Sequence, residues 1–449
     1  MSPTVSIEVP IDHLAIVQRL LLLAEELDHL AHSAPDGTIF DACESAVATW
    51  GRVVQNQLLE AAVARRIETA EKKGTPIRVG SCGRRKENGG PNARQLVSLV
   101  GVLSAKRRYG KCSCGEPSGY AVDAVLGIES RFSKMVQKHA CRLAADTSFL
   151  ATSEHLHELL DVGLCAETVR TLVEGHGQVM TRFQLQDEVT AEAFRQAKGA
   201  VEFAVDAGKV NTREEGWKDL KIGVISKREP CQGVSTAGGE GQRLHTATVV
   251  LAFAMIASSP VFQQSWRRRL RQLGVTQFGA VQVLGDGASW IWKSATRVLT
   301  GCVQTLDFFH ASQHLAKAAQ RIFGEGTPAT QLAFERGRGL LLETGWSGVC
   351  TWVGELLSVD AGGERERRQV IVGRVIGYFS QHVGRLNYAE RLGSGRAIGS
   401  GVVEGQAKTL GLRLKRRGAR WNRVNVRPMA SLVCVRHSPQ WDAYWSQAA

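Results

Sequence analysis

The fold is decided by the stretch VQVLGDGAS at residues 281–289. Its apolar run predicts a β-strand that ends at Asp286, and residues 288–299 predict a helix behind that strand. An apolar run closed by an aspartate occurs again at 200–206, and turn residues follow it at 209–216. The expected strands are 200–206, 217–226, 246–256, 281–286 and 302–308. Three neighbouring strands followed by alternating helices and strands predict a mixed sheet covered by helices.

The rest of the chain divides into helical and basic regions around this sheet. Apolar residues at helical spacing predict helices at the N-terminus. Near residue 76 the composition becomes basic and rich in glycine. The expected regions are an N-terminal helical region at 1–75, a basic segment with Gly and Cys at 76–128, a helix-turn-helix-like region at 129–180, the first part of the sheet domain at 195–317, a helical segment at 318–395 and a helical, basic end at 396–449.

The region at 129–180 has the pattern of a DNA-binding helix-turn-helix. Two amphipathic runs, 148–160 and 166–174, are separated by the short break DVGL at residues 161–164. Two helices joined by a tight turn that contains glycine have this layout. An ordinary three-helix bundle gives the same pattern, and the basic protein around it favours the DNA-binding interpretation.

Three cysteines, Cys82, Cys112 and Cys114, lie at the two ends of the basic segment. A zinc ribbon usually takes four ligands from two Cys-x-x-Cys pairs. Here two of the three cysteines form Cys-x-Cys, and no convincing fourth ligand accompanies them. We therefore do not expect zinc, and we interpret the segment as a degenerate ribbon at most, whose basic side chains still suit phosphate.

Charge and hydropathy favour a nucleic-acid partner and exclude a membrane one. Of the 449 residues, 56 are Lys or Arg and 43 are Asp or Glu, which gives a formal charge of +13. Such a surplus favours a polyanion, because binding it releases condensed counterions. The most apolar run, 249–257, is far shorter than the roughly 20 residues of a spanning helix. Without a secretory signal, the ten cysteines are expected to be reduced thiols in a cytoplasm.

Three acidic residues stand out as candidates for chemistry. Asp206 and Asp286 close two expected strands of one sheet, where ligand groups gather, although each alone also fits a turn or a helix cap. Glu404 opens an expected helix after Ser400, a plausible N-cap. From residue 405 to 437 there are nine Lys or Arg and no acidic residue. A surface Glu–Lys pair is the modest alternative for Glu404, and Glu202 is the nearest rival of Asp206.

Three carboxylates from separate segments suit a pair of divalent cations. Two such ions activate a hydroxyl nucleophile and stabilise the leaving oxygen in phosphodiester cleavage. Carboxylate oxygens prefer Mg²⁺ or Mn²⁺ to zinc. The sequence therefore predicts two Mg²⁺ or Mn²⁺ ions for each site.

Four blocks of sequence resemble the insertion-sequence transposases of the ISKra group, which are similar to the Mutator-like DDE transposases. The blocks are VLGDGASWIW at 283–292, LDFFHASQHL at 306–315, IGSGVVEG at 398–405 and RLKRRGARW at 413–421. The resemblance runs in order from residue 130 to 445. It implies an RNase H-like core that begins at 195–317, is interrupted by the helical insertion at 318–395 and ends with a catalytic helix and basic tail at 396–449.

The resemblance also implies roles for particular residues. It makes Asp206, Asp286 and Glu404 the DDE triad and the metal ligands. Asp307 and His310 match the D-x-x-H signature and are expected to orient the site from behind, a buried Asp–His pair being the structural alternative. The residues expected to contact DNA are Lys408, Arg413, Lys415, Arg416, Arg417, Arg420 and Trp421.

The function that the resemblance implies is that of a DNA transposase. Such an enzyme binds the ends of an insertion sequence, cleaves them with metal ions and transfers the strand to target DNA. We expect a homodimer or larger assembly on DNA, in a prokaryotic cytoplasm at the nucleoid. Two alternatives stay open: an RNase H-like nuclease or resolvase, which cuts without joining, and a domesticated DNA-binding protein without catalysis.

Overall fold

The computed structural model describes residues 5–73, 82–84, 86–115, 119–229, 245–358 and 365–447. The chain is a mixed α/β protein rich in helix, as the sequence predicts. It divides into two compact units, an N-terminal unit of Met1–Ala144 with Ser148–Leu172 and a C-terminal unit of Ala145–Thr147 with Val173–Ala449. Among the described helices, none has the length and apolar character needed to cross a membrane.

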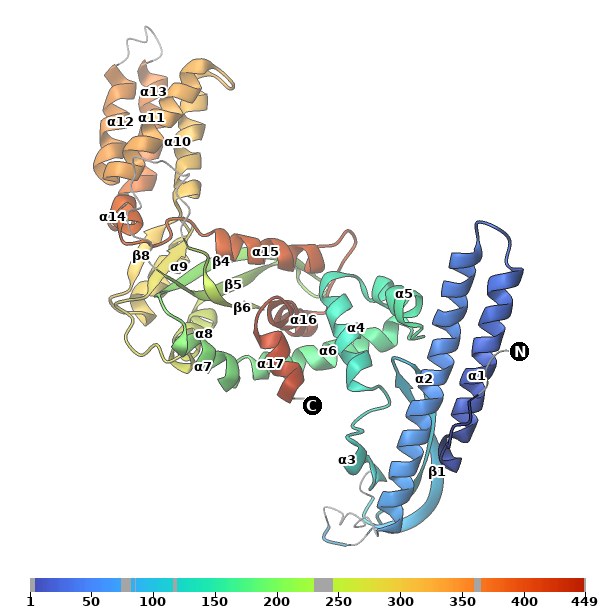
Figure 1. Ribbon diagram of the computed structural model, residues 1–449. Helices are drawn as coiled ribbons and strands as arrows, with labels where there is room; N and C mark the ends of the chain where they lie inside the picture. The colour runs from blue at the N-terminus through green and yellow to red at the C-terminus, as the bar shows by residue number, and fades with distance from the viewer. Residues whose placement is uncertain are drawn as a thin grey trace. The chain divides into compact units, whose positions relative to one another are not determined.

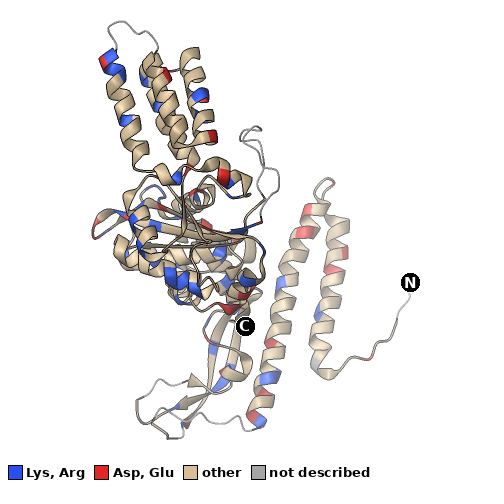
Figure 2. Cartoon of the chain, turned by 90° about the vertical axis from the view of Figure 1, so that its left-hand side faces the viewer, with Lys and Arg blue, Asp and Glu red and all other residues tan. Residues whose placement is uncertain are grey.

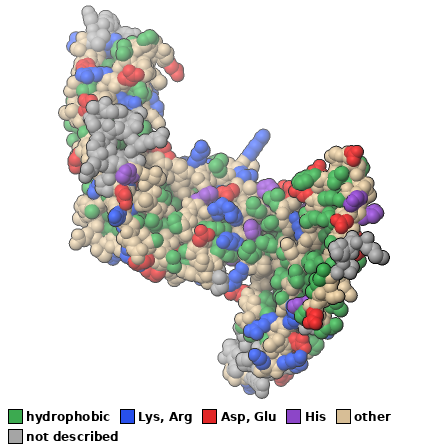
Figure 3. Space-filling model, in the orientation of Figure 1, with side chains coloured by type: hydrophobic (Ala, Val, Ile, Leu, Met, Phe, Trp, Pro, Cys, Tyr) green, Lys and Arg blue, Asp and Glu red, His purple; other side chains and the backbone are tan. Residues whose placement is uncertain are grey.

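The N-terminal unit begins with a long helical hairpin, α1 (Ile11–Ser33) and α2 (Ile39–Lys72). Both signs of charge are spread along these two helices (Figure 2). Many of their large apolar side chains are exposed, among them Ile11, Leu21 and Phe40, and hydrophobic atoms are visible over the hairpin surface in Figure 3. The helices expected within residues 1–75 are therefore present, but their apolar spacing does not lead to a fully buried face.

The basic segment forms a small antiparallel sheet, which the sequence analysis did not predict. Its strands are β1 (Glu87–Ser98), β2 (Gly101–Lys111) and β3 (Gly119–Tyr120), in that order. Alternate residues of β2 are buried, and Leu103 and Ala105 pack with Ile67 and Ala70 of α2. Arg107 is buried too, with its Nε 2.6 Å from Asp123 Oδ1 of α3 (Asp123–Leu126). That cation is consequently not free for phosphate.

The helices expected within 129–180 are α4 (Lys134–Asp146), α5 (Phe149–Leu160) and α6 (Ala166–Phe183). Ser148 caps α5, since its hydroxyl accepts from the Ala151 N–H at 3.1 Å. The short connection to α6 turns at Asp161, whose φ is +54°, and not at Gly163. The division between the two units runs through α6.

The C-terminal unit is built on a mixed five-stranded sheet (Figure 1). The strands are β4 (Ala200–Thr212), β5 (Gly216–Arg228), β6 (Thr248–Ile256), β7 (Gln282–Gly285) and β8 (Val303–Leu306). Their order is β6-β5-β4-β7-β8, with antiparallel pairs from β6 to β4 and parallel pairs from β4 to β8. The mixed sheet predicted from the sequence is confirmed.

The largest difference from the predicted strand boundaries is at β4. β4 does not end at Asp206 but continues to Thr212, so the expected turn at 209–216 shrinks to residues 213–215. The outer half of β4 is polar, but it still pairs with β5, Val210 is buried and Lys209 Nζ lies 2.6 Å from Asp219 Oδ1. Asp206 therefore lies inside a long strand, beside the point where the shorter β7 stops.

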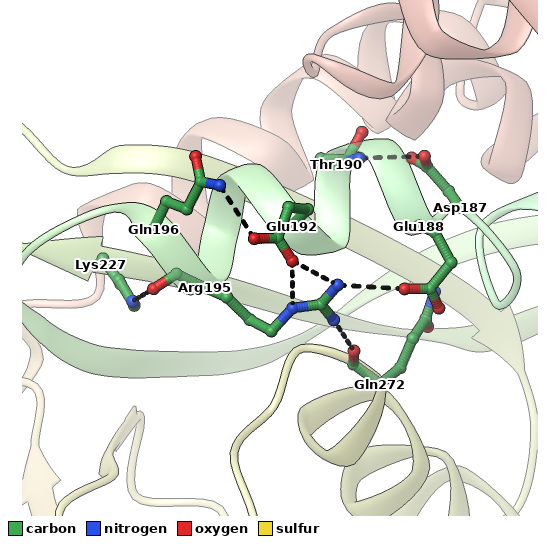
Figure 4. Close-up of polar contacts among 8 residues, drawn as sticks. All are labelled: Asp187, Glu188, Thr190, Glu192, Arg195, Gln196, Lys227 and Gln272. Carbon is green, nitrogen blue, oxygen red and sulfur yellow. Dashed lines mark hydrogen bonds and ion pairs between the residues drawn. The ribbon is translucent and has the colours of Figure 1, made fainter.

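Three helices pack around the sheet: α7 (Glu188–Gln196), α8 (Ser259–Gln272) and α9 (Ser289–Val298). Phe203, Phe253 and Trp266 are part of the core that they share with the strands. Figure 4 shows how α7 is fixed by polar contacts. Arg195 donates to Glu192 at 2.8 Å and to the Gln272 carbonyl at the end of α8 at 3.2 Å.

A helical bundle separates β8 from the last part of the chain, and it begins at Phe308, before the start of the helical segment expected at 318–395. Its elements are α10 (Phe308–Phe323), α11 (Pro328–Thr344), α12 (Trp346–Ser358), α13 (Arg365–Ser380), the 3-10 turn η3 (Val383–Arg385) and α14 (Tyr388–Gly393). The first four helices lie side by side in Figure 1. Gly337 lets α11 and α12 approach closely, because a β-carbon there would lie 2.7 Å from the Trp352 ring.

The chain then returns to the sheet with α15 (Gly401–Leu414), α16 (Arg423–Arg436) and α17 (Gln440–Gln447). α15 lies along β4, and α16 packs on β6 (Figure 1). Val403, Leu410 and Leu414 are the buried stripe of α15. Glu404 lies in the first turn of α15, on the exposed flank of this stripe, and the helix lies along β4.

Candidate active site

Three aspartates lie on or directly after neighbouring strands of the sheet. Asp286 directly follows β7 and Asp307 directly follows β8, while Asp206 follows the β4 residue that pairs with the last residue of β7. The Asp307 N–H donates to the Gly285 carbonyl at 2.8 Å, which keeps the two short strands in line up to their ends. The parallel part of the sheet thus sets three carboxylates in a row at one edge.

The two predicted catalytic aspartates also make local contacts with the backbone. Asp206 Oδ1 accepts from the Ala207 N–H at 2.7 Å, and Asp286 Oδ1 accepts from the Ala288 N–H at 2.9 Å. The Asp286 contact is a turn contact, since Ser289 begins α9. In each carboxylate this contact occupies Oδ1, and both side chains are half-buried.

The third predicted carboxylate, Glu404, reaches the same place from the first turn of α15. Burial raises the pKa of Asp206, and the negative charges of Asp286 and Glu404 raise it further. The Ala207 hydrogen bond and the charge of His310 act in the opposite direction. The structure therefore brings Asp206, Asp286 and Glu404 within electrostatic reach of one another, although Asp206 and Glu404 are far apart in the sequence.

The chemistry of this donor set fits hard divalent cations. The three groups offer only carboxylate oxygens, the ligands that Mg²⁺ and Mn²⁺ prefer. Their mutual repulsion, seen in the raised pKa of Asp206, is what a bound cation relieves. The carboxylates do not converge on one point, because the cysteines described below form the only group of three or more ligand atoms that lie within 4.8 Å of one another in the described chain.

Asp307 and Ser400 fix the position of Glu404. Asp307 is fully buried, and its Oδ2 accepts from both the N–H and the hydroxyl of Ser400, the hydroxyl at 2.6 Å. The same hydroxyl oxygen lies 3.1 Å from Glu404 Oε1. Ser400 precedes α15, as expected of an N-cap residue, but its hydroxyl contacts these two carboxylates and makes no cap bond to the helix backbone.

His310 lies one turn into α10, beside the same site. Its backbone N–H donates to Asp307 Oδ1 at 2.6 Å and caps the helix. The charge of its ring acts on Asp206. The contact between Asp307 and His310 is thus a helix cap and not a side-chain pair, and both residues stand next to the three carboxylates.

Glu202, the alternative to Asp206, makes contacts that give it a structural role. It is 3% exposed, and its Oε1 accepts from Arg228 Nε at 2.9 Å and from the Ala397 N–H at 3.1 Å. A buried carboxylate with both an ion pair and a backbone donor holds segments together. We therefore keep Asp206 in the candidate site.

Most of the cations expected to contact DNA are exposed on or just after α15. These are Lys408, Lys415, Arg416, Arg417 and Arg420. Lys415 extends towards the site, because a β-carbon on Gly208 would lie 3.6 Å from its Nζ. Gly208 and Asp206 are two residues apart on β4 and so share a face of the sheet. Arg416 Nη2 also donates to the Asp146 carbonyl at 2.9 Å.

Arg413 and Trp421, which were also expected to contact DNA, are placed differently. They are 3% and 7% exposed. The Arg413 guanidinium stacks 4.8 Å from the centre of the Trp421 ring, and burial lowers its pKa to about 10. Trp421 donates its indole N–H to the Leu414 carbonyl at 3.0 Å and pairs its backbone with Asn211. The structure corrects the expectation for both residues, which join the basic tail to β4 instead of facing a ligand.

A basic groove beside Asp286 was not predicted. It has a volume of about 470 Å³ and begins at Gly287. Its walls include Ser289, Lys293, Thr296 and Arg297 from α9 and Gln381 and Arg385 from the end of the bundle. The only sequence signal was the spacing of Lys293 and Arg297, four residues apart on one helix face.

The three cysteines of the basic segment lie closer together than the sequence suggested. Cys112 Sγ is 3.4 Å from Cys82 Sγ and 3.0 Å from Cys114 Sγ. The three sulfur atoms lie within 4.8 Å of one another, and no fourth His, Cys, Asp or Glu of the described residues joins them. The expectation that zinc is absent depends on that fourth ligand and stays a prediction.

Comparison with known proteins adds no family to this geometry. No protein-family model matches the chain, and no curated protein matches it. The site must therefore be interpreted from its own residues.

Proposed function

We propose that this protein is a DNA transposase that cleaves the ends of an insertion sequence and transfers them to target DNA. The observation that carries the proposal is the meeting of Asp206, Asp286 and Glu404 beside the cationic face of α15. The strand order β6-β5-β4-β7-β8 supports an RNase H-like core, in which the bundle from α10 to α14 is the insertion. The resemblance of residues 283–315 and 398–421 to transposases points to the same class.

Each residue of the site has a role in this chemistry. Asp206, Asp286 and Glu404 would hold the two metal ions. Ser400 and Asp307 keep the Glu404 carboxylate in place, so that the site loses little entropy when it fills. Mg²⁺ or Mn²⁺, when bound, supplies activation of the attacking hydroxyl and neutralises charge on the leaving oxygen.

The cations around the site would hold the substrate. Lys408 and Lys415 lie on the same exposed face as Glu404, and their ammonium groups would contact phosphates next to the one that is cleaved. Such contacts position the DNA without reading its sequence. In this proposal sequence recognition comes from the region of α4, α5 and α6.

Transposition also needs two ends to be processed together. The exposed apolar side chains of α1 and α2 support assembly into a homodimer or larger complex, since monomers rarely expose so many. The partner is DNA at both steps, first the element end and then the target. We place the activity in a prokaryotic cytoplasm, at the nucleoid.

A strand-transfer assay tests this proposal. The full chain is incubated with Mg²⁺ and labelled DNA that carries the sequences flanking the reading frame. Joined products support a transposase, nicked products alone support a nuclease or resolvase, and binding without cleavage supports a non-catalytic DNA-binding protein. Glu404→Gln is expected to abolish cleavage and leave DNA binding nearly unchanged. Cleavage that survives this change would remove Glu404 from the mechanism.

A further inference from the structure

The groove that begins at Gly287 is lined by cations, by neutral polar groups and by the aromatic ring of Trp292. Lys293 and Arg297 of α9 are exposed and lie four residues apart on one face of the helix. Arg385, from η3, faces them across the groove. No carboxylate of the described residues lines this groove. The surface is therefore positive without the mixture of signs that is typical of a merely soluble face.

Arg385 is held in place by groups that do not neutralise it. Its Nε donates to Gln304 Oε1 and its Nη1 to the Gln381 carbonyl, both at 2.8 Å. The guanidinium lies 4.7 Å from the centre of the Trp292 ring. Burial lowers the pKa of Arg385. An ordered, partly desolvated guanidinium with no acidic partner in the described part of the chain is a prepared anion site, because a bound anion recovers the interaction that burial removed.

The neighbouring histidine does not add to the charge of the groove. Burial, together with the nearby charge of Arg385, lowers the pKa of His382 to about 4. His382 is therefore neutral at physiological pH, and the positive charge comes from Lys293, Arg297 and Arg385. Neutral hydroxyls of Ser289 and Thr296 complete the wall on α9.

The two walls of the groove are joined at the active-site end. Tyr378 of α13 reaches Gly287, where a β-carbon would lie 2.8 Å from the Tyr378 hydroxyl oxygen. The ring of His314 stacks on Tyr378 with the ring centres 3.7 Å apart. Gly287 is the residue after Asp286. Whatever lies in the groove therefore begins next to one of the three carboxylates.

We propose that this groove binds the backbone phosphates of the DNA strand that flanks the cleaved position, on the Asp286 side. This inference rests on the proposed function, because it takes DNA as the substrate. A volume of about 470 Å³ is of the size that holds a small ligand, so the groove suits a short piece of strand. Lys293 and Arg297 contact successive phosphates, and Arg385 receives one of them. The helical insertion thus supplies one wall of a DNA channel.

The test compares two double variants of the full chain. Lys293→Ala with Arg297→Ala removes the exposed cations of the groove. Arg267→Ala with Arg271→Ala is the matched control, because it removes two exposed arginines with the same spacing on α8, outside the groove. Binding is measured by fluorescence anisotropy without divalent metal, on a labelled element end with or without DNA beyond the cleaved position.

The groove variant is expected to bind the longer DNA on the order of tenfold more weakly. The slope of log K against log salt is negative, and its magnitude should be smaller in the groove variant by about 1.4 to 1.8. This corresponds to the loss of two phosphate contacts at 0.7 to 0.9 each. On DNA that ends at the cleaved position, variant and wild type should bind equally. The α8 variant should resemble wild type on both.

The other outcomes are also decisive. Equal losses in the two double variants, or a loss that persists on the shorter DNA, would overturn the groove as the site of the flanking strand. Inorganic phosphate, added at constant ionic strength, is a competitor for the groove. If it displaces DNA from the wild type but not from the groove variant, the groove is a site for free phosphate, and its assignment to DNA is overturned. Groove-dependent binding in a protein that does not cleave with Mg²⁺ would support the groove and overturn the proposed catalysis.

Discussion

The Ser400 hydroxyl donates to the buried Asp307 carboxylate at 2.6 Å, and through this bond the start of α15 is attached to the end of β8. The same oxygen lies 3.1 Å from Glu404 Oε1. A hydroxyl has one proton, so it serves one carboxylate at a time. When a cation binds the Glu404 carboxylate, the Ser400 hydroxyl can keep its bond to Asp307. The relationship therefore positions Glu404 without competing for it.

Ser400→Ala should lower the cleavage rate about tenfold, because Glu404 then lacks its neighbouring hydroxyl while the carboxylate itself remains. DNA affinity should stay within about twofold of wild type, since this serine contacts no exposed cation. Single-turnover cleavage with Mg²⁺ measures the rate, and anisotropy measures the affinity. Ser400→Thr, which keeps the hydroxyl, serves as the control and should retain most of the rate. An alanine variant that cleaves at the wild-type rate would show that the hydroxyl does not position Glu404.

The raised pKa of Asp206 makes stability without metal depend on pH. Burial, followed by the charges of Asp286 and Glu404, raises the folded-state pKa above that of an unfolded aspartate, about 3.9. The folded state then binds more protons than the unfolded one in the interval between the two values. Its free energy of unfolding consequently falls as the pH rises through that interval.

Asp206→Asn should remove this dependence and raise the melting temperature at pH 7 in a chelator. The difference from wild type should shrink as the pH falls below about 4, where the unfolded aspartate is protonated as well. Mg²⁺ should stabilise wild type more than the variant, because the variant lacks a ligand. Thermal unfolding between pH 3 and 8 measures both effects. A variant less stable than wild type at pH 7 in chelator would contradict the repulsion inferred here.

The sequence singled out three acidic residues that the structure brings within electrostatic reach of one another, and it predicted less of their surroundings. Apolar runs that end in Asp206 and Asp286 carry local information, and the basic stretch after Glu404 marked the third carboxylate. The extension of β4 to Thr212 was missed because its outer residues are polar and only the pairing with β5 keeps them in a strand. The alternation of apolar and polar residues after Asp206 was too weak to indicate a strand.

Features that depend on distant segments were beyond a local interpretation. Cys82 and Cys112 are brought to 3.4 Å by the β1–β2 hairpin, which the sequence analysis did not predict. The basic groove joins Lys293 with Arg385, on elements that no sequence pattern connects. Composition also could not separate the buried Arg413 from the exposed Lys415, since both belong to one cationic run and only helix packing divides them.

That difference between Arg413 and Lys415 gives a third prediction. Lys415→Ala should weaken DNA binding by a similar factor for all sequences. It should also reduce the magnitude of the slope of log K against log salt by about 0.9, the value of one phosphate contact. Arg413→Ala should leave the slope unchanged but destabilise the fold by about 1–3 kcal/mol, because it removes a side chain stacked on Trp421. Salt titrations of affinity and chemical denaturation separate the two. A changed slope in the Arg413 variant would return that residue to the DNA surface.

In a last prediction, removal of two different tyrosine hydroxyls should change the free energy of unfolding in opposite directions. The Tyr378 hydroxyl oxygen is buried and has no hydrogen-bond partner among the described residues, whereas the Tyr444 hydroxyl lies 2.7 Å from His176 Nδ1. Burial lowers the pKa of His176 to about 4, so this bond joins two neutral groups near pH 7. Tyr378→Phe should stabilise the C-terminal unit by about 1 kcal/mol, since it removes an unsatisfied polar atom. Tyr444→Phe should destabilise it by about 1–2 kcal/mol, since it removes the hydrogen bond between the Tyr444 hydroxyl and His176 Nδ1. Urea denaturation of both variants at pH 7 measures the difference, and a loss of stability in Tyr378→Phe would mean that its hydroxyl has a structural partner.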